Sequence, residues 1–148
     1  MSPSRSEFIT VRGLRTHVRH WGREGAPTIF MVHGWMDVAA SFQFVVDCLD
    51  GDWHVIAPDW RGFGLSERTH SDTYWFPDYV ADLDVLLEHY SPGEAVNLLG
   101  HSMGGNVVSL YAGMHPSPRR PRARPPCSQA AASGACRLCS SSTSRSAT

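Results

Sequence analysis

Apolar residues along the first 116 positions alternate between the spacing of β-strands and that of α-helices. Strand-like patterns occupy 7–22, which turns at Gly13, and the short apolar runs 28–32, 54–57 and 95–99. Helical spacing occupies 38–49, 79–90 and 103–114. Short continuous apolar runs are typical of strands buried on both faces. The alternation therefore predicts an α/β fold with a mostly parallel sheet and helices on both of its faces.

Capping residues mark the first predicted helix, and the fold class indicates where functional residues should lie. Asp37 is placed to cap the helix at 38–49, and Gly51 is placed to end it.

In open α/β sheets, function resides in the loops at the carboxyl ends of the strands. In this sequence those loops are 33–37, 59–66 and 100–104.

The segment Gly100-His101-Ser102-Met103-Gly104 matches the pattern Gly-x-Ser-x-Gly and lies directly between a strand pattern and a helical pattern. A sharp strand-to-helix turn holds such a serine strained and exposed, and small flanking residues let strand and helix approach closely. The helix N-terminus also directs free N–H groups towards the serine. A chance glycine-serine turn is the alternative, and the strand–turn–helix context makes it the weaker one.

A second short motif, His33-Gly34-Trp35, follows the predicted strand at 28–32. In a serine acyl-transfer site, one oxyanion donor is the N–H after the nucleophile, and the other comes from the loop after an earlier strand. This rule predicts the backbone N–H groups of Met103 and Trp35 as the two donors. The imidazole of His33 is expected to fix the loop by hydrogen bonds, because the oxyanion hole uses backbone groups.

Three segments in order resemble the landmarks of the α/β-hydrolase fold superfamily: 33–35, 59–66 and 100–105. The stretch 33–42 is similar to its serine hydrolase-like branch, and the resemblance covers about residues 7–116. It implies that Ser102 is a nucleophile that attacks an ester-like bond of a small-molecule substrate through an acyl-enzyme, without a cofactor. Serine at this position argues against the family's epoxide hydrolases and haloalkane dehalogenases, which need a carboxylate there.

Other motifs favour structural roles over chemical ones. Gly62-Phe63-Gly64 begins a dinucleotide-binding pattern, but Glu67 stands where the third glycine belongs, which makes such a site unfavourable. Asp59 and Arg61 could form a catalytic pair, but a structural role, in which they brace the loop after the strand, is the favoured interpretation. Three cysteines follow in the last part of the chain, at 127, 136 and 139. No histidine lies near them to complete a zinc site, so no metal is expected.

The charge distribution divides the chain in two. All 13 basic residues are Arg, so a P-loop lysine and Schiff-base chemistry are excluded. Residues 1–116 carry 7 Arg and 14 Asp or Glu, a net charge of −7, whereas 117–148 carry 6 Arg and no acid, a net charge of +6. We therefore expect a partial hydrolase domain at 1–116 and a disordered Arg/Pro/Ser/Ala tail at 117–148. Nucleic-acid binding by the Arg-rich stretch 119–124 is the less favoured alternative.

The N-terminus has no apolar signal region, and no window approaches the roughly 20 apolar residues needed to cross a membrane. We expect a cytoplasmic protein without a membrane partner.

The residues that should activate Ser102 are missing from this sequence. In this fold the triad runs in the order serine, acid, histidine, yet no Asp or Glu follows Glu94 and no histidine follows His115. His101, His89 and His115 are poorly placed to serve as the base. We expect a hydrolase that is incomplete in this chain; the alternative is a non-catalytic truncated fragment or pseudoenzyme.

Two further expectations follow from the absence of the triad acid and histidine. The lysine-free composition suggests GC-rich coding DNA, and a frameshift near residue 116 would explain the tail. The apolar strand at 95–99 would then form an open sheet edge, through which the chain would self-associate.

Overall fold

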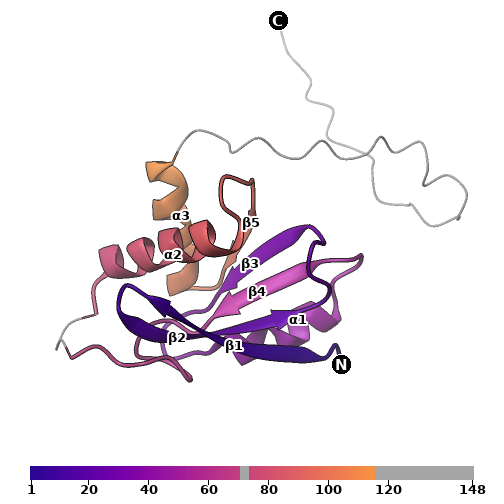
Figure 1. The fold of residues 1–148 in the computed structure, drawn as a ribbon, viewed down its shortest axis with the longest axis horizontal. Helices are drawn as coiled ribbons and strands as arrows, with labels where there is room; N and C mark the ends of the chain where they lie inside the picture. The colour runs from indigo at the N-terminus through magenta and orange to yellow at the C-terminus, as the bar shows by residue number, and fades with distance from the viewer. Residues whose placement is uncertain (71–73, 116–148) are drawn as a thin grey trace, which may run out of the picture.

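The computed structural model describes residues 1–70 and 74–115, so the predicted tail at 117–148 lies outside the described residues. Its elements alternate as the apolar pattern indicates (Figure 1). The strands are β1 Ser4–Val11, β2 Leu14–Trp21, β3 Thr28–Val32, β4 His54–Pro58 and β5 Asn97–Gly100. The helices are the 3-10 helix η1 Ala39–Phe42 and the α-helices α1 Gln43–Asp47, α2 Phe76–Tyr90 and α3 Met103–Met114.

The five strands form one mixed sheet in the order β1-β2-β4-β3-β5. β3 pairs in parallel with both β4 and β5, whereas β2 pairs antiparallel with both β1 and β4. The antiparallel pairs come from the predicted hairpin, which turns through Arg12 and Gly13 at φ values of +47° and +83°. Two residues with positive φ are typical of the tight turns whose twist matches that of paired strands. The α/β class is confirmed, and β1 and β5 occupy opposite edges of the sheet.

Helices cover both faces of the sheet, as expected. α2 and α3 lie together over one face, and α1 lies over the other (Figure 1). The core under α2 and α3 includes Phe30, Ile56 and Leu83, and the core under η1 and α1 includes Met31 and Phe42. Consecutive residues of β3 thus point to opposite cores, which explains why its sequence is an unbroken apolar run.

The segment at 38–49 is not one capped helix, so two predictions about its ends are wrong. Val38, not Asp37, is the N-cap, and α1 ends at Asp47 rather than near Gly51. Asp37 instead accepts hydrogen bonds from the Val38 N–H at 2.8 Å and from the Ser41 hydroxyl. These bonds begin a tight 3-10 turn one residue later than a capped α-helix would begin.

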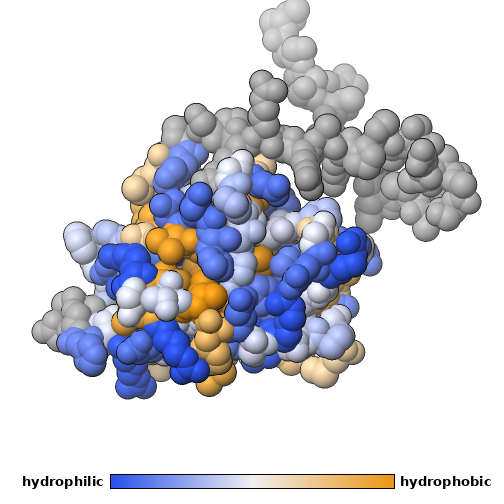
Figure 2. Space-filling model, viewed as in Figure 1, coloured by the Kyte–Doolittle hydropathy of each residue, from blue (hydrophilic) through white to orange (hydrophobic). Residues whose placement is uncertain are grey.

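Because many large apolar side chains are buried in the two cores, polar side chains cover much of the surface. Figure 2 shows a face that is largely hydrophilic, with one apolar area near its middle. Among residues 1–70 and 74–115, no helix is long and apolar enough to cross a membrane.

Candidate active site

The carboxyl ends of the three parallel strands β3, β4 and β5 meet at one edge of the sheet, and the motifs follow them there. Ser102 stands between β5 and α3 with φ +52° and ψ −116°, a conformation that a non-glycine residue rarely adopts. It is the N-cap of α3, and its side chain is exposed. The strained turn therefore presents the hydroxyl at the N-terminus of a helix, where free N–H groups and the helix dipole favour a developing negative charge.

The glycines on either side of Ser102 allow backbone contacts that no side chain would tolerate. A Cβ added to Gly104 would lie 2.2 Å from the carbonyl oxygen of Val32, and one added to Gly100 would lie 2.4 Å from that of Gly104. The His101 N–H donates to the Val32 carbonyl at 3.0 Å, which ties the turn to the end of β3. The Gly-x-Ser-x-Gly pattern thus reflects close packing of α3 against two strands.

The loop after β3 lies against the turn that holds Ser102. A Cβ on Gly34 would come within 3.1 Å of the Ser102 Cβ, so the glycine permits this approach. The next residue, Trp35, is 54% exposed, and its ring packs edge-on against Phe63 at 5.1 Å between centroids. Met103, the first residue of α3, is buried. Of the two predicted donors, Met103 follows Ser102 directly in the chain, and Trp35 follows Gly34, whose backbone approaches Ser102.

His33 is fully buried and bonds backbone groups at both of its ring nitrogens. Nε2 accepts the Trp60 N–H at 2.9 Å, and Nδ1 lies 2.7 Å from the Gly34 carbonyl oxygen. An imidazole that accepts at Nε2 carries its proton on Nδ1, so Nδ1 donates to Gly34. Burial lowers the pKa of His33, which keeps the ring neutral for these two roles. The ring joins the loop after β3 to the loop after β4.

His101, the residue before the serine, faces Asp37. Its Nδ1 lies 3.7 Å from the Asp37 carboxylate, and its side chain is 66% exposed. Partial burial raises the pKa of Asp37, but hydrogen bonds from Ser41 and the Val38 N–H outweigh burial and lower it overall. Asp37 is therefore a fixed negative charge at the rim of the site. Sequence reasoning missed this pairing because 64 positions separate the two residues and no local pattern relates them.

Asp59 and Arg61 bind different partners, so they do not form a pair with each other. The Asp59 carboxylate accepts the Ala39 N–H at 2.7 Å, the Leu65 N–H at 2.9 Å and a hydrogen bond from His17 Nδ1 at 2.8 Å. Gly64 makes room for it, because a Cβ there would lie 2.2 Å from its oxygen. This glycine of the apparent dinucleotide motif therefore serves loop packing.

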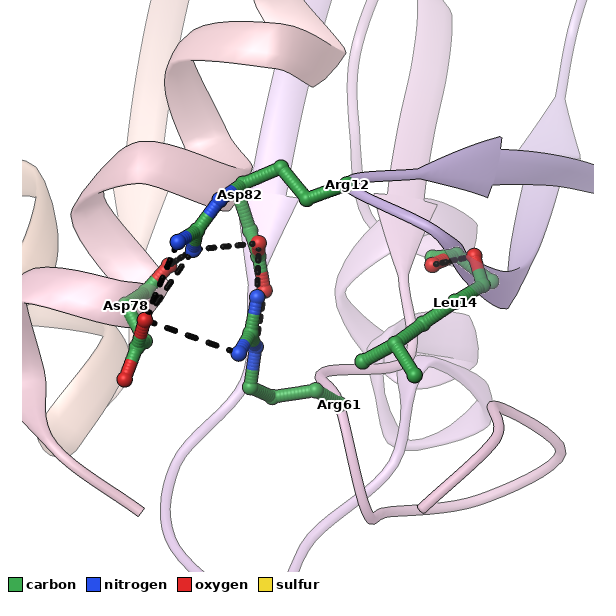
Figure 3. Close-up of polar contacts among 6 residues, drawn as sticks. Arg12, Leu14, Arg61, Asp78 and Asp82 are labelled. Carbon is green, nitrogen blue, oxygen red and sulfur yellow. Dashed lines mark hydrogen bonds and ion pairs between the residues drawn. The ribbon is translucent and has the colours of Figure 1, made fainter. Parts of the chain in front are cut away.

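Arg61 lies in a four-charge cluster that joins three distant segments (Figure 3). Its guanidinium binds the Asp82 carboxylate of α2 through two hydrogen bonds of 2.5 Å, and both side chains are nearly buried. Arg12 from the hairpin turn reaches Asp78 and Asp82, each at 3.2 Å. The hydrogen bond to Asp82 raises the pKa of Arg61, so its guanidinium stays charged. It fastens the hairpin and the loop after β4 to α2.

Across the described part of the chain, no hydrogen bond joins the Ser102 hydroxyl to a histidine or a carboxylate. His89 is exposed on α2. His115 lies at the far end of α3, where it stacks on Tyr111 at 4.3 Å. The same described residues contain no cluster of His, Cys, Asp or Glu that could hold a metal ion. Residues 1–70 and 74–115 thus present a strained serine and two neighbouring loops, but no proton acceptor that contacts the serine.

Comparison with known proteins agrees with this geometry. The model of the alpha/beta hydrolase fold family matches residues 27–120, which is more than half of the chain. The chain belongs to the α/β hydrolase fold family. The resemblance carried by the three motifs is therefore confirmed, as is the α/β-hydrolase architecture.

Relatives within the family carry different names. A "Serine hydrolase-like protein" of Danio rerio is 36% identical over 97 residues, which cover 65% of this chain and 29% of that protein. "Epoxide hydrolase A" of Mycobacterium tuberculosis is 34% identical over 110 residues, which cover 73% of this chain and 34% of that protein. The solved "Thioesterase Domain From Curacin Biosynthetic Pathway" superposes with a TM-score of 0.72 at 24% identity, covering 77% of this chain and 43% of that one. The chain thus spans about a third of these curated relatives.

Proposed function

We propose that this chain carries the nucleophile half of a serine hydrolase, with Ser102 as the attacking residue and a small-molecule ester-like compound as substrate. The observation that carries the proposal is the φ of +52° at Ser102. Ser102 lies between β5 and α3, next to glycine positions where the backbone packs too closely to admit a side chain. Strain of this kind persists only where the surroundings enforce it, and it is common at catalytic positions. A serine here, rather than a carboxylate, favours ester chemistry over epoxide opening.

In the proposed reaction the Ser102 oxygen attacks the carbonyl carbon of the ester and forms a tetrahedral intermediate. The N–H groups of Trp35 and Met103 would stabilise its oxyanion, and loss of one such donor typically costs about 100- to 1,000-fold in rate. The alcohol then leaves with the proton that the Ser102 hydroxyl gave up, and water hydrolyses the acyl-enzyme, which releases the acid and restores the hydroxyl. His33 and Asp59 act as positioning residues, because they hold the loop that carries Trp35.

Proton transfer limits the reaction in this chain. Since no base contacts Ser102 within residues 1–70 and 74–115, we expect only the acceleration that survives loss of a triad, roughly 10³–10⁴-fold over water. The second candidate function is a non-catalytic fragment or pseudoenzyme of the family. The lack of a base in contact with Ser102 within the described residues favours that second candidate as well.

Covalent labelling separates the two candidates. A fluorophosphonate probe should modify the tryptic peptide that spans 69–119, and Ser102→Ala should abolish that modification. Ser109→Ala is the matched control, because Ser109 lies on α3 with its hydroxyl bonded to the Gly105 carbonyl at 2.8 Å. Folded protein that takes no label at Ser102 would favour the non-catalytic candidate.

A further inference from the structure

A second serine, at the opposite edge of the sheet, has the hydrogen-bonded base that Ser102 lacks. Ser6 is exposed on β1, and its Oγ lies 2.9 Å from Nε2 of His17 on β2. The other ring nitrogen of His17, Nδ1, lies 2.8 Å from the Asp59 carboxylate. His17 and Asp59 are almost fully buried, at 1% and 3% exposure. A serine, an imidazole and a carboxylate thus form one hydrogen-bonded chain that ends at the surface.

The direction of this hydrogen-bonded chain follows from its buried end. Asp59 already accepts the N–H groups of Ala39 and Leu65, so its carboxylate acts as an acceptor. His17 Nδ1 is therefore the donor, and Nε2 of the neutral ring is left as the acceptor for the Ser6 hydroxyl proton. This is the order in which a serine nucleophile, a base and an orienting acid act together.

Two neighbours of Ser6 supply what an acyl transfer would need besides a base. Arg19 is the Cα partner of Ser6 on β2, so both side chains stand on the same face of the sheet. Its Nη1 donates to the Ser4 hydroxyl at 2.9 Å, which places a permanent positive charge beside Ser6. Phe8 follows on the same face, 42% exposed, with its ring 5.1 Å from that of His17. The charge of Arg19 suits a developing oxyanion. The Phe8 ring, whose centroid lies 3.8 Å from the Arg15 guanidinium, offers its exposed part to an aromatic leaving group.

We propose that Ser6 is an acyl-accepting site for small activated aryl esters, with His17 as its base and Asp59 as the positioning acid. The Ser6 oxygen forms a bond to the ester carbonyl carbon, and the bond from that carbon to the phenolic oxygen breaks. The hydroxyl proton passes to His17 Nε2 and from there to the departing phenolate. The product is an ester at Ser6 and a free phenol. This site does not depend on Ser102.

The test uses the full chain carrying Ser102→Ala, incubated with p-nitrophenyl acetate and mapped by tryptic digestion and fragment-ion mass spectrometry. Cleavage after Arg5 and Arg12 isolates Ser6 as the only serine of its peptide. Ser4 is a built-in control, because it lies two residues away on the same strand and face and contacts Arg19 but no imidazole. We expect the acetyl ester to form at least tenfold faster at Ser6 than at Ser4.

Two variants sharpen the test. Ser6→Ala should remove the acetyl ester from its peptide. His17→Gln should reduce acetylation of Ser6 to the rate at Ser4. Equal acetylation of Ser6 and Ser4 in the Ser102→Ala protein would overturn the proposal, whether or not His17→Gln folds. A His17→Gln protein that folds and still acetylates Ser6 preferentially would overturn it as well.

Discussion

Ser102 and Ser6 occupy opposite edges of one sheet and are built in opposite ways. Ser102 has a backbone that a serine rarely adopts, with close glycine packing, and no base among the described residues. Ser6 lies on a regular strand, and its hydroxyl is bonded to a buried histidine and, through it, to a buried aspartate. The difference teaches that the strained turn and the proton acceptor are separate structural devices. A motif can preserve the first at a serine for which the described residues supply no example of the second.

The two regions also differ in what holds them together. The turn at Ser102 depends on backbone atoms that pack directly against each other. A side chain larger than that of glycine would separate them. The hairpin region depends on side-chain networks, namely the four-charge cluster around Arg61 and a buried pair of histidines at positions 20 and 54. We therefore expect substitutions to act by steric clash in the first region and by charge in the second.

The largest effect is expected at the turn. In Gly104→Ala the new Cβ would meet the Val32 carbonyl oxygen at 2.2 Å, and neither backbone can move without separating α3 from β3. We predict a loss of about 4 kcal/mol or more in the free energy of unfolding, measured by urea denaturation. Gly113→Ala is the matched control on the same helix, because nothing lies within 4 Å of its Cβ. That variant should gain about 0.5–1 kcal/mol, and similar losses in both variants would contradict the packing argument.

The next effect is expected in the four-charge cluster. Asp82→Ala leaves Arg61 nearly buried without its bidentate partner, which should cost about 3–5 kcal/mol of unfolding free energy. The control is Asp52→Ala, which removes an exposed ion pair with Arg23 and should cost less than about 1 kcal/mol. Both values come from urea denaturation at pH 7. Equal costs would show that burial of the Arg61 pair has no energetic consequence.

Acidification should destabilise the fold through His20, a buried histidine of the hairpin region. Burial, followed by the charges of Arg5 and His54, lowers the pKa of His20 from 6.5 to about 4. Between these values the unfolded chain takes up a proton that the folded chain does not, so stability falls as the pH drops from 6.5 towards 4. We expect a loss of about 2–3 kcal/mol, measured by urea denaturation across this window.

The histidine responsible can be identified by substitution. His20→Phe should remove more than half of this pH dependence. His89→Gln should leave it unchanged, because His89 is exposed on α2. A free energy of unfolding that is constant from pH 6.5 to 4 would refute the assignment.

The smallest effect on stability concerns the sheet edge at β5. In the part of the chain that the structure describes, β5 pairs only with β3, and the neighbouring α3 exposes Leu110 and Met114 at 48% and 66%. We propose that the 148-residue chain self-associates through this edge. Replacing both α3 residues with lysine should shift the protein towards monomer in light scattering, while stability changes by less than about 0.5 kcal/mol.

A residue on the other face serves as the control for association. Phe44→Lys changes an apolar residue on α1 that is also exposed, at 75%, and should leave the association unchanged. A monomer of 16.3 kDa at every concentration of the unsubstituted chain would exclude self-association.

Local sequence patterns were sufficient where the structure depends on neighbours along the chain. The apolar run at 28–32 and the helical spacing at 103–114 each match an observed element, because period and burial are properties of adjacent residues. The turn at Gly100–Gly104 was predictable for the same reason. The helix at 38–49 was not, since the hydrogen bond from the Ser41 hydroxyl to Asp37 and a 3-10 turn replace the expected cap.

The sequence by itself determined the order of strands and helices, the strained serine and the glycines around it, because backbone sterics act over a few residues. Only the tertiary structure decided which polar side chains meet. His17 lies 42 positions from Asp59, and Arg61 lies 21 positions from Asp82; no local periodicity relates either pair. Such partners are brought together by strand order and helix packing, and buried polar groups must then satisfy one another. For this reason an imidazole lies beside the hydroxyl of Ser6, which matches no motif, whereas the described residues place none against the hydroxyl of Ser102.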